Sequence, residues 1–330
     1  MKQRLRVGVS GALDRERTIH GRTLLRSITT AINAVPGFGE AAILFGNDEA
    51  SGSQACEIAG RFITAGVDVV LGPFGSDCLM AAAALYAEAS IPVVTPAATA
   101  CLDQPLEAVF RICPNDHAIA AGIVGRIRER GFRQVHVTSD DSRHCRGLKG
   151  MITAALGSGI IAPPSDPTEA DALVFTGKLQ SSRAWLSKLR ERSVILPVLM
   201  TDDAAASELL GGIDRPGDLE VLGFPAAHQV ATTDPAVARY QHFHGTPPVY
   251  CLETLAAAAV IAQAGPPGGI LAALQCCTFA TALGPVRFDR GERFGATLAW
   301  WKPGRDGALS AHDLVVVPQR EPMTQAVLNP

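Results

Sequence analysis

The sequence predicts an α/β protein made of two successive units, each with a parallel central sheet. Three observations lead to this prediction. Short, largely apolar runs rich in β-branched residues alternate with helical stretches, which is typical of parallel strands covered by helices on both faces. The pattern restarts after the polar joint at 114–116. The length of 330 residues is enough for two domains that each bury a core.

The elements of the first unit follow one another at short spacing. Residues 67–71, with the sequence VDVVL, are a mostly β-branched run, and 91–95, with the sequence IPVVT, form the next one. The strands expected in this unit are 4–9, 41–45, 67–71 and 91–95. The helices expected between them are 23–34, 54–65 and 79–89.

The second unit has the same alternation and is followed by a tail. Its expected helices are 118–130, 147–156, 183–192 and 204–210, and its expected strands are 134–138, 172–175, 195–200 and 219–223. After Pro247 come a long helix and a second helix at 270–275, then strands at 285–288, 295–301 and 314–317. Strands this late cannot form a third compact domain, so we expect them to complete the two earlier sheets.

Composition argues against several classes of function. The formal net charge is -3, and neither sign forms a long run, whereas a nucleic-acid or bilayer surface normally shows a basic patch. Aromatic residues are only 5% of the chain, which disfavours stacking platforms for bases. No segment approaches the roughly 20 apolar residues that a spanning helix needs. We therefore expect neither direct nucleic-acid binding nor membrane insertion.

The N-terminal residues and the cysteines bear on localisation. Residues 1–9 lead into a strand, without the uninterrupted apolar stretch of a secretory signal. The eight cysteines are scattered through apolar segments, and none forms a CxxC pair. The expectation is a cytoplasmic protein, or a periplasmic one if a leader has been removed.

Polar side chains gather where four of the expected strands end, at 72–77, 96–99, 139–144 and 201–203. Open parallel sheets bind ligands at the carboxyl ends of their strands, where helix N-termini favour anions. Ser76 and Thr99 of the first unit can hold a carboxylate, and Asp203 of the second can pair with an ammonium group. His144 belongs to the same set. The pattern predicts a zwitterion held between the two units.

Each of these residues also has a simpler interpretation. Ser76 is a suitable N-cap, and Asp202 or Asp203 is a suitable cap for a helix that begins near 204. His144 stands in a polar stretch typical of a surface loop, and Thr99 fits an ordinary turn. The zwitterion prediction depends on all of them occurring together at equivalent strand ends.

Several stretches resemble one known family in order along nearly the whole chain. They are GVSGALD, GVDVVLGPFGS, ASIPVVTPAAT, VFRICPND, DDSRHCRGL, PPVYCLETLAAAAVIAQA and GPVRFDRGERFG. The chain resembles the Leu/Ile/Val-binding family of type I periplasmic binding proteins, which are substrate-binding proteins of ABC transporters. It also resembles their cytoplasmic relative, the amide sensor that regulates amidase expression.

The resemblance implies two Rossmann-like lobes joined by a three-strand hinge. The first lobe would comprise 1–116 and 247–293, and the second 117–246 and 294–330. Ligand contacts to both lobes would exist only in the closed state, so that binding shifts the population toward it.

The resemblance also implies roles for particular residues. Ser76, Ala97 and Thr99 would hold the α-carboxylate and part of the ammonium group, and Asp203 would pair with the ammonium. His20 and His144 stand where the family usually has tyrosine. Lys178 lies in a further segment in which the family's tyrosine is missing. The simpler interpretation is that Lys178 points to solvent, as lysines usually do. These departures favour an acidic, amide or polar amino acid over leucine.

The function expected from these observations is that of a receptor without catalytic activity. A nicotinamide enzyme would need a GxGxxG loop, and a nucleotide-hydrolysing enzyme would need a GxxxxGK[ST] loop. A serine hydrolase would need a GxSxG nucleophile elbow. The sequence contains none of these three motifs. His242 and His244 are too closely spaced for the usual helical metal pair, so neither a metal nor a cofactor is expected. The partner would be a membrane permease or, for a sensor, a cytoplasmic regulatory protein; an enzyme acting on the same ligand is the less favoured alternative.

Overall fold

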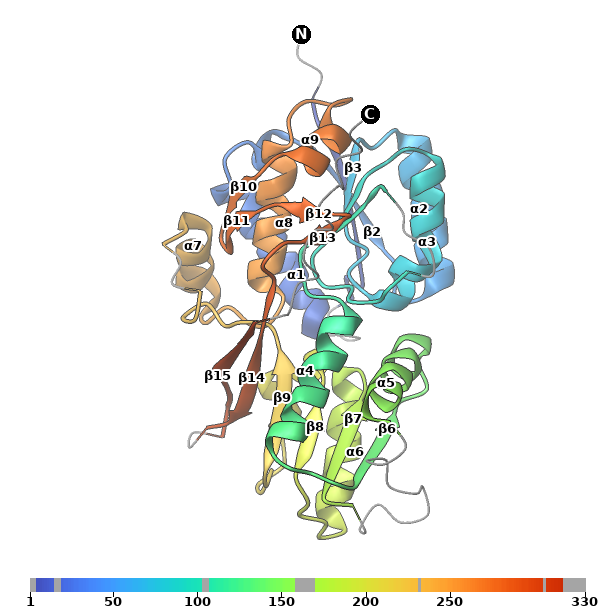
Figure 1. Cartoon of the computed structure of the whole chain (residues 1–330). Coiled ribbons are helices and arrows are strands. Elements are labelled where there is room, and N and C mark those ends of the chain that lie inside the picture. The colour runs from blue at the N-terminus through green and yellow to red at the C-terminus, as the bar shows by residue number, and fades with distance from the viewer. Residues whose placement is uncertain are drawn as a thin grey trace, which may run out of the picture.

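The computed structural model describes residues 4–316, except 15–18, 103–106, 158–169, 231–232 and 305–306. The chain forms two lobes, each built on its own sheet, one above the other in Figure 1. The predicted α/β architecture with two parallel-dominated sheets is confirmed.

The first sheet has seven strands in the order β12-β13-β5-β4-β3-β1-β2. Its strands are β1 (Arg6–Gly11), β2 (Ala42–Asn47), β3 (Val69–Leu71), β4 (Val93–Thr95), β5 (Val109–Arg111), β12 (Phe288–Asp289) and β13 (Glu292–Arg293). The strands β1 to β5 pair in parallel. Helices α2 (Gly52–Ala65) and α3 (Ser76–Glu88) pack together on one face of this sheet, and α1 (Ile19–Ala34) and α8 (Cys251–Gln263) pack together on the other (Figure 1).

The second sheet has six strands in the order β15-β14-β9-β8-β7-β6. They are β6 (Val135–Ser139), β7 (Ala172–Thr176), β8 (Val198–Met200), β9 (Leu219–Gly223), β14 (Thr297–Pro303) and β15 (Leu309–Val316). β6 to β9 are parallel, and β14 is antiparallel to both β9 and β15. Helices α4 (Asp116–Glu129), α5 (Arg143–Leu156) and α6 (Leu179–Glu191) lie beside this sheet in the same lobe (Figure 1).

The remaining elements lie around the first lobe and at the lobe boundary. Helix α7 (Pro235–His244) packs against α1 and α8. Helix α9 (Ile270–Cys276) precedes a hairpin of β10 (Phe279–Thr281) and β11 (Gly284–Val286). Three short 3-10 helices are η1 (Phe38–Glu40), η3 (Asp202–Ala204) and η4 (Ser207–Leu210).

Sequence periodicity explains how the helices contact the sheets. Helix α2 buries Ala55, Ile58, Ala59 and Phe62, which recur at the spacing of one helical face. Gly8 of β1 and Gly46 of β2 lie directly beneath this face: a Cβ at Gly8 would come 2.6 Å from the Phe62 ring, and one at Gly46 would come 2.3 Å from Ile58. The two glycines therefore allow α2 to approach the sheet closely.

The late strands β12 to β15 complete both earlier sheets, as predicted. The strand predicted at 285–288 is instead divided between β11, which pairs with β10 in a separate hairpin, and β12. The chain passes from the first sheet to the second after β5, returns before α8, and crosses again between β13 and β14 (Figure 1). β13 pairs with β5, and the buried Arg111 guanidinium forms an ion pair with Glu292 across this contact. The residue boundaries predicted for the two lobes stay predictions.

The structure corrects the helix predicted at 204–210. This segment forms two separate 3-10 turns, because Ala206 is extended, with φ -137° and ψ 145°, and interrupts them. The six helices α1 to α6 all begin two to four residues earlier than predicted. Helix α1 starts at Ile19, and α5 starts at Arg143, where the Ser142 hydroxyl accepts a hydrogen bond from the Cys145 N–H as an N-cap.

Candidate functional site

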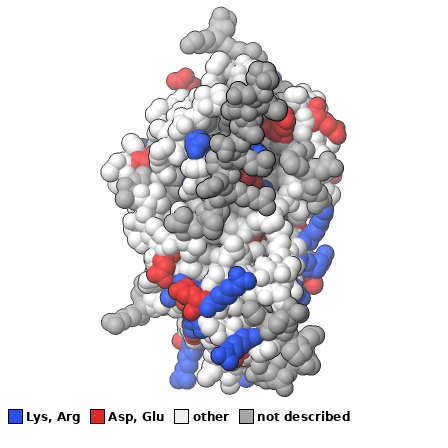
Figure 2. Space-filling view, viewed as in Figure 1, with Lys and Arg blue, Asp and Glu red and all other residues white. Residues whose placement is uncertain are grey.

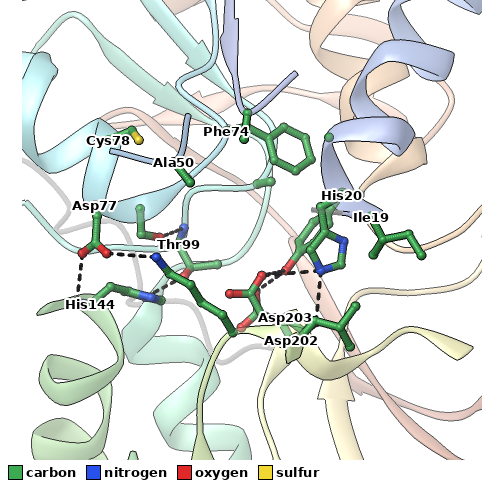
Figure 3. Close-up of a pocket in the computed structure, with 18 of the residues that line it drawn as sticks. Ile19, His20, Ala50, Phe74, Asp77, Cys78, Thr99, His144, Asp202 and Asp203 are labelled. Atoms are coloured by element: carbon green, nitrogen blue, oxygen red, sulfur yellow. Dashed lines mark hydrogen bonds and ion pairs between the residues drawn. The ribbon is translucent and has the colours of Figure 1, made fainter. Parts of the chain in front are cut away.

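A cavity of about 160 Å³ lies between the lobes, at the carboxyl ends of strands from both sheets. The structure brings all the predicted binding residues to its lining: His20, Ser76, Ala97, Thr99, His144, Lys178 and Asp203. Figure 3 shows Asp77, Thr99 and His144 at one end of the cavity and His20, Asp202 and Asp203 at the other. The two ends have different chemistry.

Ser76 connects the two strand-end loops of the first lobe. It is the first residue of α3, and Gly75 is the N-cap, so the interpretation of Ser76 as a cap is wrong. The Ser76 hydroxyl instead accepts hydrogen bonds from the backbone N–H groups of Thr99 (3.1 Å) and Ala100 (3.2 Å). The loop after β4 is thereby held against the N-terminus of α3, the end of a helix that favours an anion.

His144 comes from the second lobe and contacts Thr99 of the first. Its Nε2 atom lies 3.1 Å from the Thr99 hydroxyl and 2.9 Å from Oδ1 of Asp116. The imidazole is largely buried, so the interpretation of His144 as a surface residue is wrong. Burial alone would lower the pKa of His144, but the hydrogen bond to Asp116 raises this pKa well above 6.5. Burial would likewise raise the pKa of Asp116, and the bond with His144 lowers it instead. Both shifts favour an imidazolium beside a carboxylate.

Lys178 also faces the opposite lobe. Its ammonium lies 3.4 Å from Oδ2 of Asp77, so the side chain does not simply point to solvent. Burial would lower the pKa of Lys178, but the charges of Asp77 and Asp203 raise it. The Lys178 N–H donates to Asp140 at 2.8 Å, and Oδ1 of Asp77 accepts the His144 N–H at 3.0 Å. Asp77 therefore connects α3 to two segments of the second lobe.

Tyr250 joins the two adjacent aspartates at the other end. Its hydroxyl lies 2.9 Å from Oδ2 of Asp202 and 3.0 Å from Oδ1 of Asp203. The side chain of Asp203 is 31% exposed and faces the cavity, whereas Asp202 is buried behind it. Burial and the charge of Asp203 raise the pKa of Asp202 to about 7. Neither carboxylate caps a helix, because η3 has Thr201 as its N-cap and no side-chain capping bond.

His20 completes this end from the first turn of α1. Its Nε2 atom lies 3.1 Å from the Asp203 carbonyl oxygen and 3.8 Å from Oδ1 of Asp203. The His20 ring packs edge-on against Tyr250 with centroids 4.9 Å apart. His20 therefore orients Asp203 as well as lining the cavity.

Sequence reasoning missed the aromatic wall. Tyr250 and Phe74 both line the cavity and pack edge-on, with ring centroids 5.4 Å apart. Tyr250 is buried and has a left-handed backbone, φ 71°, at the start of α8. The signal was present, since Phe74 belongs to the stretch GPFGS and Tyr250 to PPVYCLETL. Asp77, the second residue of α3, was predicted only as part of the polar segment 72–77.

Charge on the molecular surface agrees with the composition. Basic and acidic side chains are mixed on the face of the lower lobe seen in Figure 2, without a patch of one sign. Among the residues that the structure describes, no helix has the length and apolar character needed to cross a bilayer. Within the same residues, His, Cys, Asp and Glu side chains form no group of three suited to a metal ion.

Comparison with known proteins supports the resemblance. The family described as "Receptor family ligand binding region" matches residues 31–158. Leu/Ile/Val-binding protein homolog 1 of Brucella melitensis biotype 1 is 23% identical over 340 residues, with 91% of each chain covered. Leu/Ile/Val-binding protein homolog 2 of Brucella abortus (strain 2308) is 26% identical over 152 residues, which are 43% of this chain and only 40% of that protein.

Solved structures show the same fold at low sequence identity. The leucine-binding protein LivK of Thermotoga maritima MSB8 superposes with a TM-score of 0.82 at 18% identity, covering 94% of this chain and 99% of that one. The branched-chain amino acid transporter substrate-binding protein LivJ of Streptococcus pneumoniae, in complex with isoleucine, gives 0.80 at 16% identity, covering 96% and 99%. The chain thus has the fold of the type I periplasmic binding proteins, and its sequence is similar to those of Leu/Ile/Val-binding protein homologues.

Proposed function

We propose that the chain is a receptor that closes its lobes around a small amino acid or a related compound and performs no chemistry on it. One observation carries this proposal: the cavity places Ser76, Thr99 and the N-terminus of α3 at one end and the Asp203 carboxylate at the other. Groups suited to a carboxylate and to an ammonium therefore come from opposite lobes. Only the closed arrangement offers both to one ligand.

The polar lining favours a polar ligand over a branched-chain one. Asp77 can accept a hydrogen bond and Lys178 can donate one, and His144 is cationic beside Asp116. An alkyl side chain placed against these groups would exclude water from them without offering a hydrogen-bond partner in return, which is unfavourable. A carboxamide supplies one donor and one acceptor. We propose an amide-bearing or otherwise polar amino acid, or a simple amide, as the ligand.

The closed state would be recognised by a second protein. The similarity to ABC-transporter substrate-binding proteins supports a membrane permease as that partner, which would place the receptor in the periplasm. A cytoplasmic regulatory protein that captures or releases the closed form is the alternative. The relatives with the same fold are binding proteins, which supports the assignment of a receptor instead of an enzyme.

Thermal unfolding in the presence of candidate ligands tests this function. The full chain is screened against the twenty common amino acids, short aliphatic amides and urea. A ligand at one hundred times its dissociation constant that binds only the folded state adds about 2.7 kcal/mol to the free energy of unfolding. We expect one of the amino acids or amides to raise the melting temperature.

Calorimetry on matched variants then locates the binding. Asp203→Asn and Ser76→Ala should each weaken the hit at least about tenfold, since each removes an interaction worth about 1.4 kcal/mol or more. The control substitutions Asp289→Asn and Ser53→Ala alter exposed residues that do not line the cavity and should leave affinity unchanged. A folded protein that none of the compounds stabilises, or a hit that both site variants bind normally, would show that the proposal is wrong.

A further inference from the structure

A second and larger cavity lies between the lobes, next to the first turn of α1. Its volume is about 430 Å³, within the range of sites that hold small organic ligands. Of the described residues that line the two cavities, only Ile19 and His20 belong to both. We propose that this second cavity, here named the hinge cavity, binds a small organic anion with an apolar body.

The charges around the hinge cavity favour an anion. Arg22 and Arg26 lie one turn apart on α1, and both line the cavity, as do His228 and His244. Glu208 is the one acidic residue among the described lining residues. It lies 3.5 Å from Arg22, and both side chains are about half exposed, so this pair offsets little of the positive charge.

The exposed Arg26 side chain hydrogen-bonds to Tyr240 of α7 and lies near His244. Burial raises the pKa of Tyr240, and both the charge of Arg26 and a hydrogen bond with it act in the opposite direction. Burial and the charge of Arg26 lower the pKa of His244, which is therefore a neutral hydrogen-bonding group at neutral pH. Arg26 thus supplies a positive charge beside an uncharged imidazole.

The other walls are apolar. The Trp301 indole N–H is already used, because it donates to the Phe224 carbonyl oxygen at 2.9 Å. What Trp301 presents to the cavity is therefore its ring surface. Val249, Pro248 and Leu309 add aliphatic surface. A ligand that satisfies this site has one anionic group near Arg26 and a flat or compact hydrocarbon body.

The hinge cavity takes its walls from both lobes. Helices α1 and α7 form one side, and η4, β14 and β15 form the other. A bound anion would therefore contact both lobes at a place separate from the Ser76–Asp203 cavity. The assignment of this second site stands whichever ligand the first cavity binds.

Three probes of the same shape and different charge test the proposal. Isothermal titration calorimetry on the full chain uses 2-naphthoate, the neutral 2-naphthamide and the cationic 2-naphthylmethylammonium. We expect 2-naphthoate to bind with a stoichiometry of one, the amide to bind at least roughly tenfold more weakly, and the ammonium not to bind. Equal binding of acid and amide, or no binding of 2-naphthoate to the folded protein, would overturn the proposal.

Variants place the probe in one cavity or the other. Arg26→Gln keeps a hydrogen-bonding side chain and should weaken 2-naphthoate roughly tenfold. Ser207→Trp, at an exposed lining residue, should block the cavity. It is a second variant, independent of Arg26→Gln, so that the assignment does not rest on one substitution. Arg61→Gln on the exposed face of α2 and Ser76→Ala in the first cavity should leave the affinity unchanged. Loss of binding in Ser76→Ala with normal binding in Arg26→Gln would place the probe in the first cavity and refute the assignment.

Discussion

The Nε2 atom of His144 lies 2.9 Å from Oδ1 of Asp116, and both side chains are largely buried. This pair connects the first turns of two neighbouring helices, α4 and α5, and His144 also contacts Thr99 of the other lobe. The raised pKa of His144 and the lowered pKa of Asp116 mean that folding favours the charged form of each.

The pair should make stability depend on pH at both ends of the range. A histidine with a raised pKa stabilises fully below its unfolded value of about 6.5, and the contribution is lost as pH rises through the folded pKa. Asp116 contributes above about 3.8 and loses its contribution as pH falls through its lowered folded pKa. Urea unfolding of the wild type and of His144→Gln should therefore converge as the pH is raised above neutrality. A constant difference between the two proteins at all pH values would contradict this prediction.

Removing His144 altogether should be costly. His144→Ala leaves the buried Asp116 carboxylate without its cationic partner, which costs about 3–5 kcal/mol when a buried pair is broken. His144→Gln retains a donor and should cost less. Equilibrium denaturation at pH 6 measures both, and an alanine variant as stable as the glutamine variant would show that Asp116 finds another partner.

Asp202 should destabilise the protein at alkaline pH. Its folded pKa of about 7 exceeds its ordinary value of 3.8, so the free energy of unfolding falls as pH rises between these two values. Asp202→Asn keeps an acceptor for the Tyr250 hydroxyl and removes the buried charge. The variant should be more stable than the wild type at pH 8 by about 2–4 kcal/mol and should lose this advantage near pH 4. Parallel unfolding curves at both pH values would rule out a titration of Asp202 in this range.

Asp77 should favour closure of the lobes in the absence of ligand. It accepts the His144 N–H and pairs with Lys178, both of which belong to the second lobe. Asp77→Ala removes both contacts, whereas Lys178→Gln removes only a half-exposed ion pair worth about 0–1 kcal/mol. In small-angle X-ray scattering without ligand, we expect the radius of gyration to increase more for Asp77→Ala than for Lys178→Gln. Asp289→Ala, an exposed substitution, serves as the control and should scatter like the wild type.

Gly72 should not tolerate a side chain. Its φ is +117°, and a Cβ there would come 2.3 Å from the Ser10 carbonyl oxygen. Gly72→Ala should lower the free energy of unfolding by at least about 2 kcal/mol, because both backbone strain and a steric clash oppose it. Gly60→Ala is the matched control: Gly60 lies within α2, a Cβ there has nothing within 4 Å, and the exchange should stabilise the helix by about 1 kcal/mol. Thermal unfolding monitored by circular dichroism measures both changes.

The sequence predicted the sheets well because their strands are short buried runs between helices, and this alternation is visible in the residues themselves. It also pointed to Ser76, Thr99 and Asp203 as cavity residues, because the carboxyl ends of parallel strands meet at one edge of each sheet. It could not identify hydrogen-bond partners that are distant in the sequence. Periodicity indicates that His144 follows a strand, but not that Asp116, 28 residues away, accepts its hydrogen bond.

Tyr250 shows the same limit more clearly. It precedes a helix that is apolar on all sides, so hydrophobic patterning assigns it to the core of the first lobe. Its hydroxyl reaches two carboxylates of the second lobe, 47 and 48 residues earlier in the chain, and its backbone has a left-handed conformation that patterning does not reveal. The helix predicted at 204–210 failed for a similar reason, since the extended Ala206 directs the chain past α6 instead of continuing the turn.

The pairing of β13 with β5 has a consequence for the order in which the protein is built. Arg111 and its ion-pair partner Glu292 are 181 residues apart. At a ribosomal rate of about 5–20 residues per second, the arginine is therefore synthesised roughly 10–40 seconds before the glutamate. During that interval the four parallel strands β6 to β9 of the second lobe have all been synthesised, while the edge of β5 is still uncovered. The first lobe, although its synthesis begins first, is therefore the one whose sheet is completed last. A chaperone that covers the β5 edge of the nascent chain would act at a stage that refolding of the full-length protein in vitro does not contain.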